Sequence, residues 1–209
     1  FVLGVVVSAR LVGGGTSGFS GATAVVQGDV PSLMRTTFTV RDFHPKVDRT
    51  GPINWIARNP NDVNEVFASS MWGGLWRSAD RGFHWHLVST LPSRSVSAVA
   101  FMFDGTPGGA VLVTTQEDFS TPSGAGVWRS DDHGRGWKQV GRVSDGRGCP
   151  SIPRAYSIAV RDTRAWVATN CCVLASTNGR TFDMLPAGVF GRGSLTGRNP
   201  QYFYSVEVT

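Results

Sequence analysis

Hydrophobic and polar residues alternate over short runs along most of the chain, with the two-residue period of β-strands. The first run is "FTVRDF", residues 38–43, and the second is "INWIARNP", residues 53–60, which ends in the turn "NPND". No stretch shows convincing helical periodicity. The pattern predicts an all-β chain with four strands in each unit of about 45–50 residues. The predicted strands are 38–43, 53–60, 65–70, 73–78 and 84–89; then 96–103, 110–115, 126–130 and 137–141; then 155–160, 165–170, 173–176 and 182–185; and finally 202–208.

One ten-residue phrase occurs twice, as "WRSADRGFHW" (76–85) and "WRSDDHGRGW" (128–137), and a weaker copy reads "STNGRTF" (176–182). The serines of the three copies are 52 and 46 residues apart, a period that indicates a repeat architecture. Each copy fits a tight turn with one serine, one side-chain acceptor for backbone N–H groups, one glycine for a positive φ and one apolar plug. These residues are Ser78, Asp80, Gly82 and Trp85; Ser130, Asp132, Gly134 and Trp137; and Ser176, Asn178, Gly179 and Phe182.

The repeated turn resembles the Asp-box, or BNR repeat, of sialidases, sortilin-type receptors, xyloglucanase-type glycoside hydrolases and photosystem II assembly factors. The stretch "GPINWIARNPNDVNEVFASSMWGGLWRSADRGFHW" is similar from end to end to a blade of bacterial BNR proteins. The resemblance covers about residues 37–209 and implies a β-propeller of four-stranded antiparallel blades. It also implies that the turns are structural, because the Asp-box lies on the face away from the ligand site.

The repeats predict about three complete blades plus parts of two others. Propellers of this superfamily use six or more blades, so residues 37–209 are expected to form an open arc or a fragment. Another chain or a missing segment would complete it, and strand 38–43 would pair at the outer edge of a blade built mostly by other residues. Residues 1–36 do not match the repeat, and they are predicted to be a Gly/Val-rich extension of strand plus loop.

Composition narrows the possible partners. Hydrophobic residues make up 41% of the 209, which suits a globular protein. The net charge of +5 comes from scattered residues, with no Lys/Arg run and no nucleic-acid motif, so no nucleic-acid partner is predicted. No stretch is long enough to span a bilayer. The apolar start "FVLGVVVSAR" fits a β-strand, or alternatively the tail of a secretory signal.

The candidate functional residues lie in the loops that a propeller places on the face opposite the repeated turns. Trp72, in the short glycine-containing loop "SSMWGGLW", is the best single ligand contact because an aromatic ring stacks on a sugar. Arginines there can bind an anion, and two carboxylates about 5–10 Å apart would be needed for glycoside hydrolysis. The alternative for each carboxylate is that it caps a turn or faces water, and the alternative for Trp72 is that it is a packed loop residue. The arginines are Arg49, Arg94, Arg142, Arg147 and Arg154, and the weak catalytic candidates are Asp48, Glu117, Asp118 and Asp145.

Sialidase chemistry is not carried over to this chain. The early Arg-Ile-Pro motif of sialidases is absent, because "SIPR" (151–154) has the wrong order, and glutamate is scarce. The four histidines are dispersed and no third ligand accompanies His84 and His86. We therefore predict no metal and no cofactor.

Three cysteines, Cys149, Cys171 and Cys172, fall in two loops of the same predicted blade and face. A disulfide from Cys149 to Cys171 or Cys172 would join these loops, and Cys172 is preferred because Cys171 can turn inward as a small apolar residue. Three reduced thiols are the alternative. A disulfide would indicate an oxidising compartment, so the protein is predicted to be secreted or extracytoplasmic.

Two functions remain open at this point. One is a non-catalytic binding or assembly module with a glycan or protein ligand on the loop face. The other is a secreted glycoside hydrolase of the xyloglucanase or sialidase-like type, or the N-terminal part of one.

Overall fold

The computed structural model describes residues 51–116, 125–143, 153–170 and 172–185, and these residues form twelve strands and no helix. The chain divides into Phe1–His44 and Pro45–Thr209, and every described residue belongs to the second unit. The strands are β1 (Ile53–Arg58), β2 (Val66–Ser70), β3 (Gly74–Ser78), β4 (His86–Leu87), β5 (Val96–Met102), β6 (Ala110–Thr115), β7 (Gly126–Ser130), β8 (Lys138–Arg142), β9 (Ala155–Arg161), β10 (Arg164–Thr169), β11 (Val173–Ser176) and β12 (Asp183–Met184).

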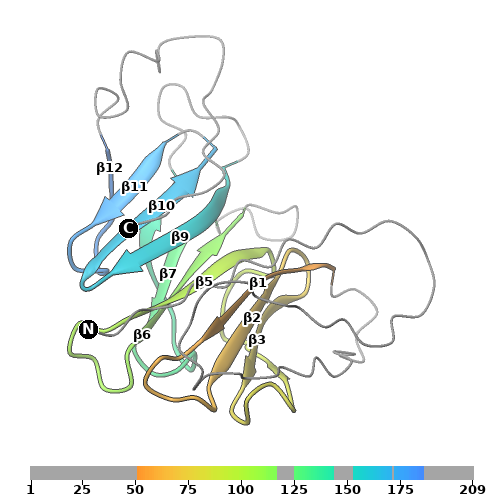
Figure 1. Ribbon diagram of the computed structural model, residues 1–209. Helices are drawn as coiled ribbons and strands as arrows, with labels where there is room; N and C mark the ends of the chain where they lie inside the picture. The colour runs from red at the N-terminus through yellow and green to blue at the C-terminus, as the bar shows by residue number, and fades with distance from the viewer. Residues whose placement is uncertain (1–50, 117–124, 144–152, 171, 186–209) are drawn as a thin grey trace, which may run out of the picture. The chain divides into compact units, whose positions relative to one another are not determined.

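The strands form three antiparallel sheets, and each sheet consists of four strands that follow one another in the chain (Figure 1). The first blade is β1–β4, the second is β5–β8 and the third is β9–β12. This arrangement confirms the all-β fold of four-stranded units that the alternating pattern predicts. The blades are simple meanders, because short turns can join only antiparallel neighbours.

Apolar cores lie between successive blades. Between the first and second blades, Phe67 and Leu75 pack with Val96, Val99 and Val111. A second core joins the second and third blades, and it contains Leu112, Val127, Ile158, Val167 and Leu174. The middle strands β2 and β6 are buried along their whole length, and β6 lies in the blade that has a described neighbour on each face. Hydrophobic burial between sheets is therefore the main force that joins one repeat to the next.

Two of the three outer strands are shorter than predicted. The pattern predicts 84–89 and 182–185, but β4 and β12 contain two residues each, whereas β8 has five, as predicted for 137–141. At β4 the preceding turn competes with the sheet for the first of the predicted residues. The backbone N–H of His84 donates to the Asp80 carboxylate at 2.8 Å instead of joining the sheet.

Several predictions concern residues outside the described ranges. These are the strands at 38–43 and 202–208, the extension 1–36 and its boundary with the propeller. They stay predictions.

Candidate functional site

The first repeated turn, residues 78–85, is closed by its own serine and aspartate. Ser78 Oγ accepts a hydrogen bond from the Gly82 N–H at 2.8 Å and donates one to Asp80 Oδ1 at 2.8 Å. The same carboxylate oxygen accepts from the His84 N–H, and Asp80 Oδ2 lies 2.5 Å from His84 Nδ1. The backbone hydrogen bond from His84 is the largest of the contacts that hold the pKa of Asp80 well below its ordinary value.

The other two repeated turns, 130–137 and 176–182, use the same bonds. Ser130 Oγ and Ser176 Oγ each accept a backbone N–H at 2.8 Å, from Gly134 and Gly179. Asp132 accepts the Gly136 N–H at 2.8 Å, while Asn178 accepts those of Arg180 and Thr181 at 2.8 and 3.1 Å. Partial burial acts to raise the pKa of Asp132, but hydrogen bonds from Gly136, Ser130 and Arg135 lower it overall. These side chains therefore form most of their hydrogen bonds within their own turns.

The aromatic residue of each turn folds back over the turn. Trp85 Nε1 donates to the Gly82 carbonyl at 2.8 Å, and Trp137 Nε1 donates to the Gly134 carbonyl at 3.2 Å. Trp137 packs on the core between the first and second blades, and Phe182 packs on the core between the second and third. All three rings are half-buried, so they are partial plugs and not fully buried ones.

A polar cluster between the first and second blades was not singled out from the sequence. Glu65, only 1% exposed, accepts hydrogen bonds from Asn59 Nδ2 at 2.7 Å and Arg77 Nε at 2.8 Å. Its carboxylate also lies 3.0 Å from Nδ1 of His133, which belongs to the repeated turn of the second blade. Burial acts to raise the pKa of Glu65, but the bonds from Asn59, His133 and Arg77 outweigh it and lower the pKa. We call these four residues the first interblade cluster.

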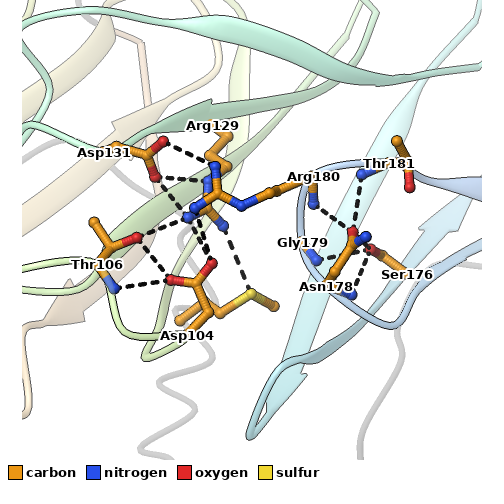
Figure 2. A network of polar contacts seen from close by, with 10 residues as sticks. Asp104, Thr106, Arg129, Asp131, Ser176, Asn178, Gly179, Arg180 and Thr181 are labelled. Carbon is orange, nitrogen blue, oxygen red and sulfur yellow. Dashed lines mark hydrogen bonds and ion pairs between the residues drawn. The ribbon is translucent and has the colours of Figure 1, made fainter.

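The second interblade cluster joins the second and third blades and consists of Asp104, Thr106, Arg129, Asp131 and Arg180 (Figure 2). Arg129 Nη2 lies 2.8 Å from Asp104 Oδ2 and 2.6 Å from Asp131 Oδ1. From the third blade, Arg180 reaches Asp104 at 3.5 Å and Asp131 at 3.4 Å. Burial acts to raise the pKa of Asp104, but Thr106 and Arg129 lower it overall. Every carboxylate in both clusters is held by cations or donors, so the clusters are suited to joining blades and not to proton transfer.

A sequence signal for these clusters did exist. Arg77 and Arg129 occupy the same position of the repeated phrase, directly after the tryptophan, and each binds an acid from the loop between the first two strands of its own blade. The third repeat has Ala175 at this position. A repeated arginine inside a buried strand requires a repeated acid nearby.

Backbone hydrogen bonds bring the predicted ligand loops together on one face. The Gly74 N–H donates to the Arg94 carbonyl at 2.8 Å, which joins the loop before β3 to the loop before β5. In the next blade, the Gln116 N–H donates to the Ser95 carbonyl at 3.0 Å, and Gln116 also pairs with Arg154. The loop face is defined here by the described parts of these loops, 70–74, 89–96, 115–116, 153–155 and 169–170.

Trp72 lies on the loop face and is 60% exposed. Its ring edge packs against the backbone of Gly51, where a Cβ would come within 2.9 Å of Trp72 Cε3. Gly51 also has a φ of 62°, so a larger residue there is excluded by both conformation and space. The indole is therefore held along one edge while much of its surface faces water.

Arg94 and Arg154, which were predicted ligand contacts, are exposed on the same face, and Arg142 is exposed at the end of β8. No described carboxylate lies within ion-pair distance of Arg94 or Arg154. The remaining candidates, Arg49, Arg147, Asp48, Glu117, Asp118 and Asp145, lie outside the described residues and stay predictions.

Cys172 is buried at the start of β11, next to Thr169. Thr169 Oγ1 accepts the Cys172 N–H at 2.9 Å, donates to the Cys172 carbonyl at 2.7 Å and lies 3.4 Å from Sγ. Burial raises the pKa of the Cys172 thiol. Cys149 and Cys171 lie outside the described residues, so the Cys149–Cys172 disulfide stays a prediction.

The described residues contain neither a candidate metal-binding group nor a candidate membrane-spanning helix. No three His, Cys, Asp or Glu side chains in these ranges are placed to hold a metal ion. Within the same ranges, no helix has the length and apolarity needed to cross a bilayer.

Comparison with known proteins identifies the fold. No protein-family model matches the sequence, and no curated protein matches it either. Among solved structures, the chain is similar to an ancestral GH74 enzyme, with a TM-score of 0.52 and 22% identity over 66% of this chain and 20% of that one. It also matches YCF48 from Cyanidioschyzon merolae (TM-score 0.47, 17% identity, 66% of this chain and 38% of that one). A third match is the GH74 xyloglucanase from Xanthomonas campestris (TM-score 0.46, 22% identity, 64% and 23%).

The chain therefore spans about a fifth of the length of the ancestral GH74 enzyme. At this level of identity the likeness concerns the fold and not the activity. Together with the three four-stranded antiparallel sheets, it shows that the chain has the fold of a β-propeller and that the described residues form three of its consecutive blades.

Proposed function

We propose that this chain is an extracytoplasmic, non-catalytic binding module that holds a glycan on its loop face. The observation that carries the proposal is Trp72, an indole that is 60% exposed and packed by one edge against Gly51. The exposed indole lies on the loop face, where a ligand can reach it without displacing other side chains. Stacking against the apolar face of a sugar is a suitable role for this indole, because the ring is already ordered before the ligand arrives.

The neighbouring arginines support a ligand with many oxygen atoms. Arg94 and Arg154 are exposed, and their carbonyl groups are tied to Gly74 and Asn170 by backbone hydrogen bonds at 2.8 and 3.0 Å. The main chain at both arginines is therefore fixed while the guanidinium groups stay in water. Guanidinium groups donate several hydrogen bonds in one plane, which suits sugar hydroxyl or carboxylate groups.

The absence of catalysis is part of the proposal and rests on the described acids. Glu65, Asp80, Asp104 and Asp132 all have lowered pKa values and existing hydrogen-bond partners, and all lie in the repeated turns or in the clusters beside them. A glycoside hydrolase needs one carboxyl group with a raised pKa to donate a proton. The hydrolase alternative would rely on Asp48, Glu117, Asp118 and Asp145.

The test is isothermal titration calorimetry of the full chain with xyloglucan oligosaccharides and, separately, with sialylated oligosaccharides. We expect one of these glycans to bind and Trp72→Ala to weaken that binding at least about tenfold, which corresponds to about 1.4 kcal/mol. The matched control is Phe83→Ala, because Phe83 is 63% exposed but lies in a repeated turn. Binding that is equal in Trp72→Ala and the parent would refute the proposal.

The same samples separate the two functions. Release of reducing ends from a bound glycan would show a hydrolase, and Trp72-dependent binding without release supports the binding module. An extracytoplasmic location is tested by counting thiols under denaturing, non-reducing conditions. If Cys149 pairs with Cys172, one of the three cysteines keeps a free thiol. The disulfide would close a loop of about 22 residues and stabilise the fold by roughly 3 kcal/mol. Three free thiols would contradict it.

A further inference from the structure

Among the described residues, acids and arginines are distributed unequally between the two faces of the blades. Every described acid lies in a repeated turn, in a loop between the first two strands of a blade or at the start of β12, and these acids are Asp62, Glu65, Asp80, Asp104, Asp131, Asp132, Asp162 and Asp183. The described parts of the loop face contain Arg94 and Arg154 and no acid. An anionic ligand that contacts these residues therefore meets positive charge without competition from a described carboxylate.

The two arginines occupy almost equivalent positions in successive blades. The Gln116 N–H donates to the Ser95 carbonyl at 3.0 Å in the second blade, and the Asn170 N–H donates to the Arg154 carbonyl at 3.0 Å in the third. Because these are the same hydrogen bond of the repeat, Arg154 is equivalent to Ser95, which directly follows Arg94. Each arginine therefore lies in the loop that enters its own blade, and both side chains are exposed.

The spacing of the two arginines is set by the packing of their blades. The backbone of Gln116 in the second blade pairs with that of Arg154, which leads into the third. Since packed sheets are about 10 Å apart, the main chains at Arg94 and Arg154 are separated by about one such spacing. Two guanidinium groups on separate blades suit two carboxylates of one ligand better than a single shared carboxylate.

Trp72 extends this arrangement into the first blade. The Gly74 N–H donates to the Arg94 carbonyl at 2.8 Å, and Trp72 lies two residues before Gly74 in the same loop. The exposed indole is therefore close to Arg94 and further from Arg154. We call Trp72, Arg94 and Arg154 the loop-face row. It takes one residue from each of three blades, and two sheet spacings make it roughly 20 Å long.

We propose that the loop-face row binds a linear uronic-acid oligosaccharide, with one sugar ring on Trp72 and carboxylates on Arg94 and Arg154. In an extended β-1,4-linked chain successive sugars face opposite ways, so carboxylates on one side recur at every second unit. That repeat is close to the spacing of about 10 Å between packed sheets, and about four units cover the row. The inference rests on the proposed glycan-binding function and names the class of glycan.

The first test compares two series of ligands by isothermal titration calorimetry on the 209-residue chain. One series is β-1,4-linked glucuronic acid of two, four and six units, and the other is glucose with the same linkage and lengths. The series differ by a carboxylate in place of a hydroxymethyl group, so both can stack on Trp72. The glucuronate tetramer should bind at least about tenfold more tightly than the glucose tetramer and than the glucuronate dimer. Raising the salt from about 0.05 M to about 0.5 M should weaken only the glucuronate series.

The second test assigns the contacts. Arg154→Gln should weaken binding of the glucuronate tetramer at least about tenfold and that of the glucose tetramer less than about twofold. Trp72→Ala should weaken binding of both tetramers, because stacking does not depend on the carboxylates. The matched control is Arg135→Gln, which removes an exposed arginine from the second repeated turn and changes the net charge equally.

The outcomes separate this inference from the proposed function. Equal, Trp72-dependent binding of the two tetramers would overturn the inference and leave the glycan-binding function in place. Equal losses in Arg135→Gln and Arg154→Gln would show a general attraction to the positive chain, which also overturns the inference. So would a sialylated oligosaccharide with one carboxylate that binds as tightly as the glucuronate tetramer. If neither series binds, the inference fails, and the xyloglucan and sialylated titrations decide the proposed function separately.

Discussion

Arg129 and Arg180 both contact Asp104, yet replacing them with methionine should have very different effects on stability. The Arg129 side chain is 3% exposed and lies 2.8 Å from Asp104. The Arg180 side chain is 55% exposed and lies 3.5 Å from the same carboxylate. Asp104 itself has a side chain that is only 7% exposed. The pair of substitutions therefore compares a buried ion pair with an exposed one around one acid.

The expected magnitudes follow from burial. Arg129→Met leaves a buried carboxylate with Thr106 and the distant Arg180 as its partners, and removing one member of a buried ion pair costs about 3–5 kcal/mol. Arg180→Met removes an exposed contact, which is worth about 0–1 kcal/mol. The loss from Arg129→Met should shrink when Asp104 is changed to asparagine as well, because the unpaired charge is then gone.

Urea unfolding followed by tryptophan fluorescence measures these differences, provided that the slope of the unfolding free energy against urea concentration is the same in all variants. The reasoning would be refuted by equal losses in Arg129→Met and Arg180→Met. Strict additivity of Arg129→Met and Asp104→Asn would refute it too, since it would show that the two side chains do not interact.

Two further predictions concern the core and the response to acid. Trp137→Ala should lower the free energy of unfolding by about 2 kcal/mol. Loss of a fully buried ring costs about 3–5 kcal/mol, and this indole is only half-buried. An unchanged urea midpoint would show that the ring does not join the blades. The pKa of Glu65 is lowered from 4.5 in the folded chain, so its stabilisation is complete above that value and is lost as the pH falls through the lower folded pKa. Thermal melts between about pH 5 and pH 3 should therefore show a smaller loss of stability in Glu65→Gln than in the parent, and identical slopes would contradict this.

The strands and turns could be predicted because their causes are local. Alternation in "INWIAR" places β1 correctly, and the spacing of Ser78, Asp80 and Gly82 is sufficient to build a turn whose bonds lie within the same few residues. The outer strand β4 was overestimated because the turn competes for its first residues, as His84 shows.

The contacts that cross between blades in the two clusters could not be predicted by the same reasoning, although the repeated arginines indicate the acid pairs within each blade. Glu65 and His133 are 68 residues apart, and nothing in either local sequence shows that one faces the other. Such a contact depends on how one blade packs on the next, which is a property of the assembled cores. The position of Trp72 in a loop before two glycines could be read from the sequence, but its exposure and its contact with Gly51 required the structure.

The repeated turns also have a consequence for the order of folding events. The bonds that close each turn, such as Ser78 Oγ to the Gly82 N–H, join residues at most four apart in the chain. The ion pairs between blades join residues 49 to 76 apart, as in Arg180 with Asp131 and Asp104. Local contacts require little loop closure and form within microseconds, whereas distant ones must first overcome a larger loss of chain entropy. We therefore expect the hairpins around the serines to form early and independently of each other, and the docking of blades to limit the folding rate.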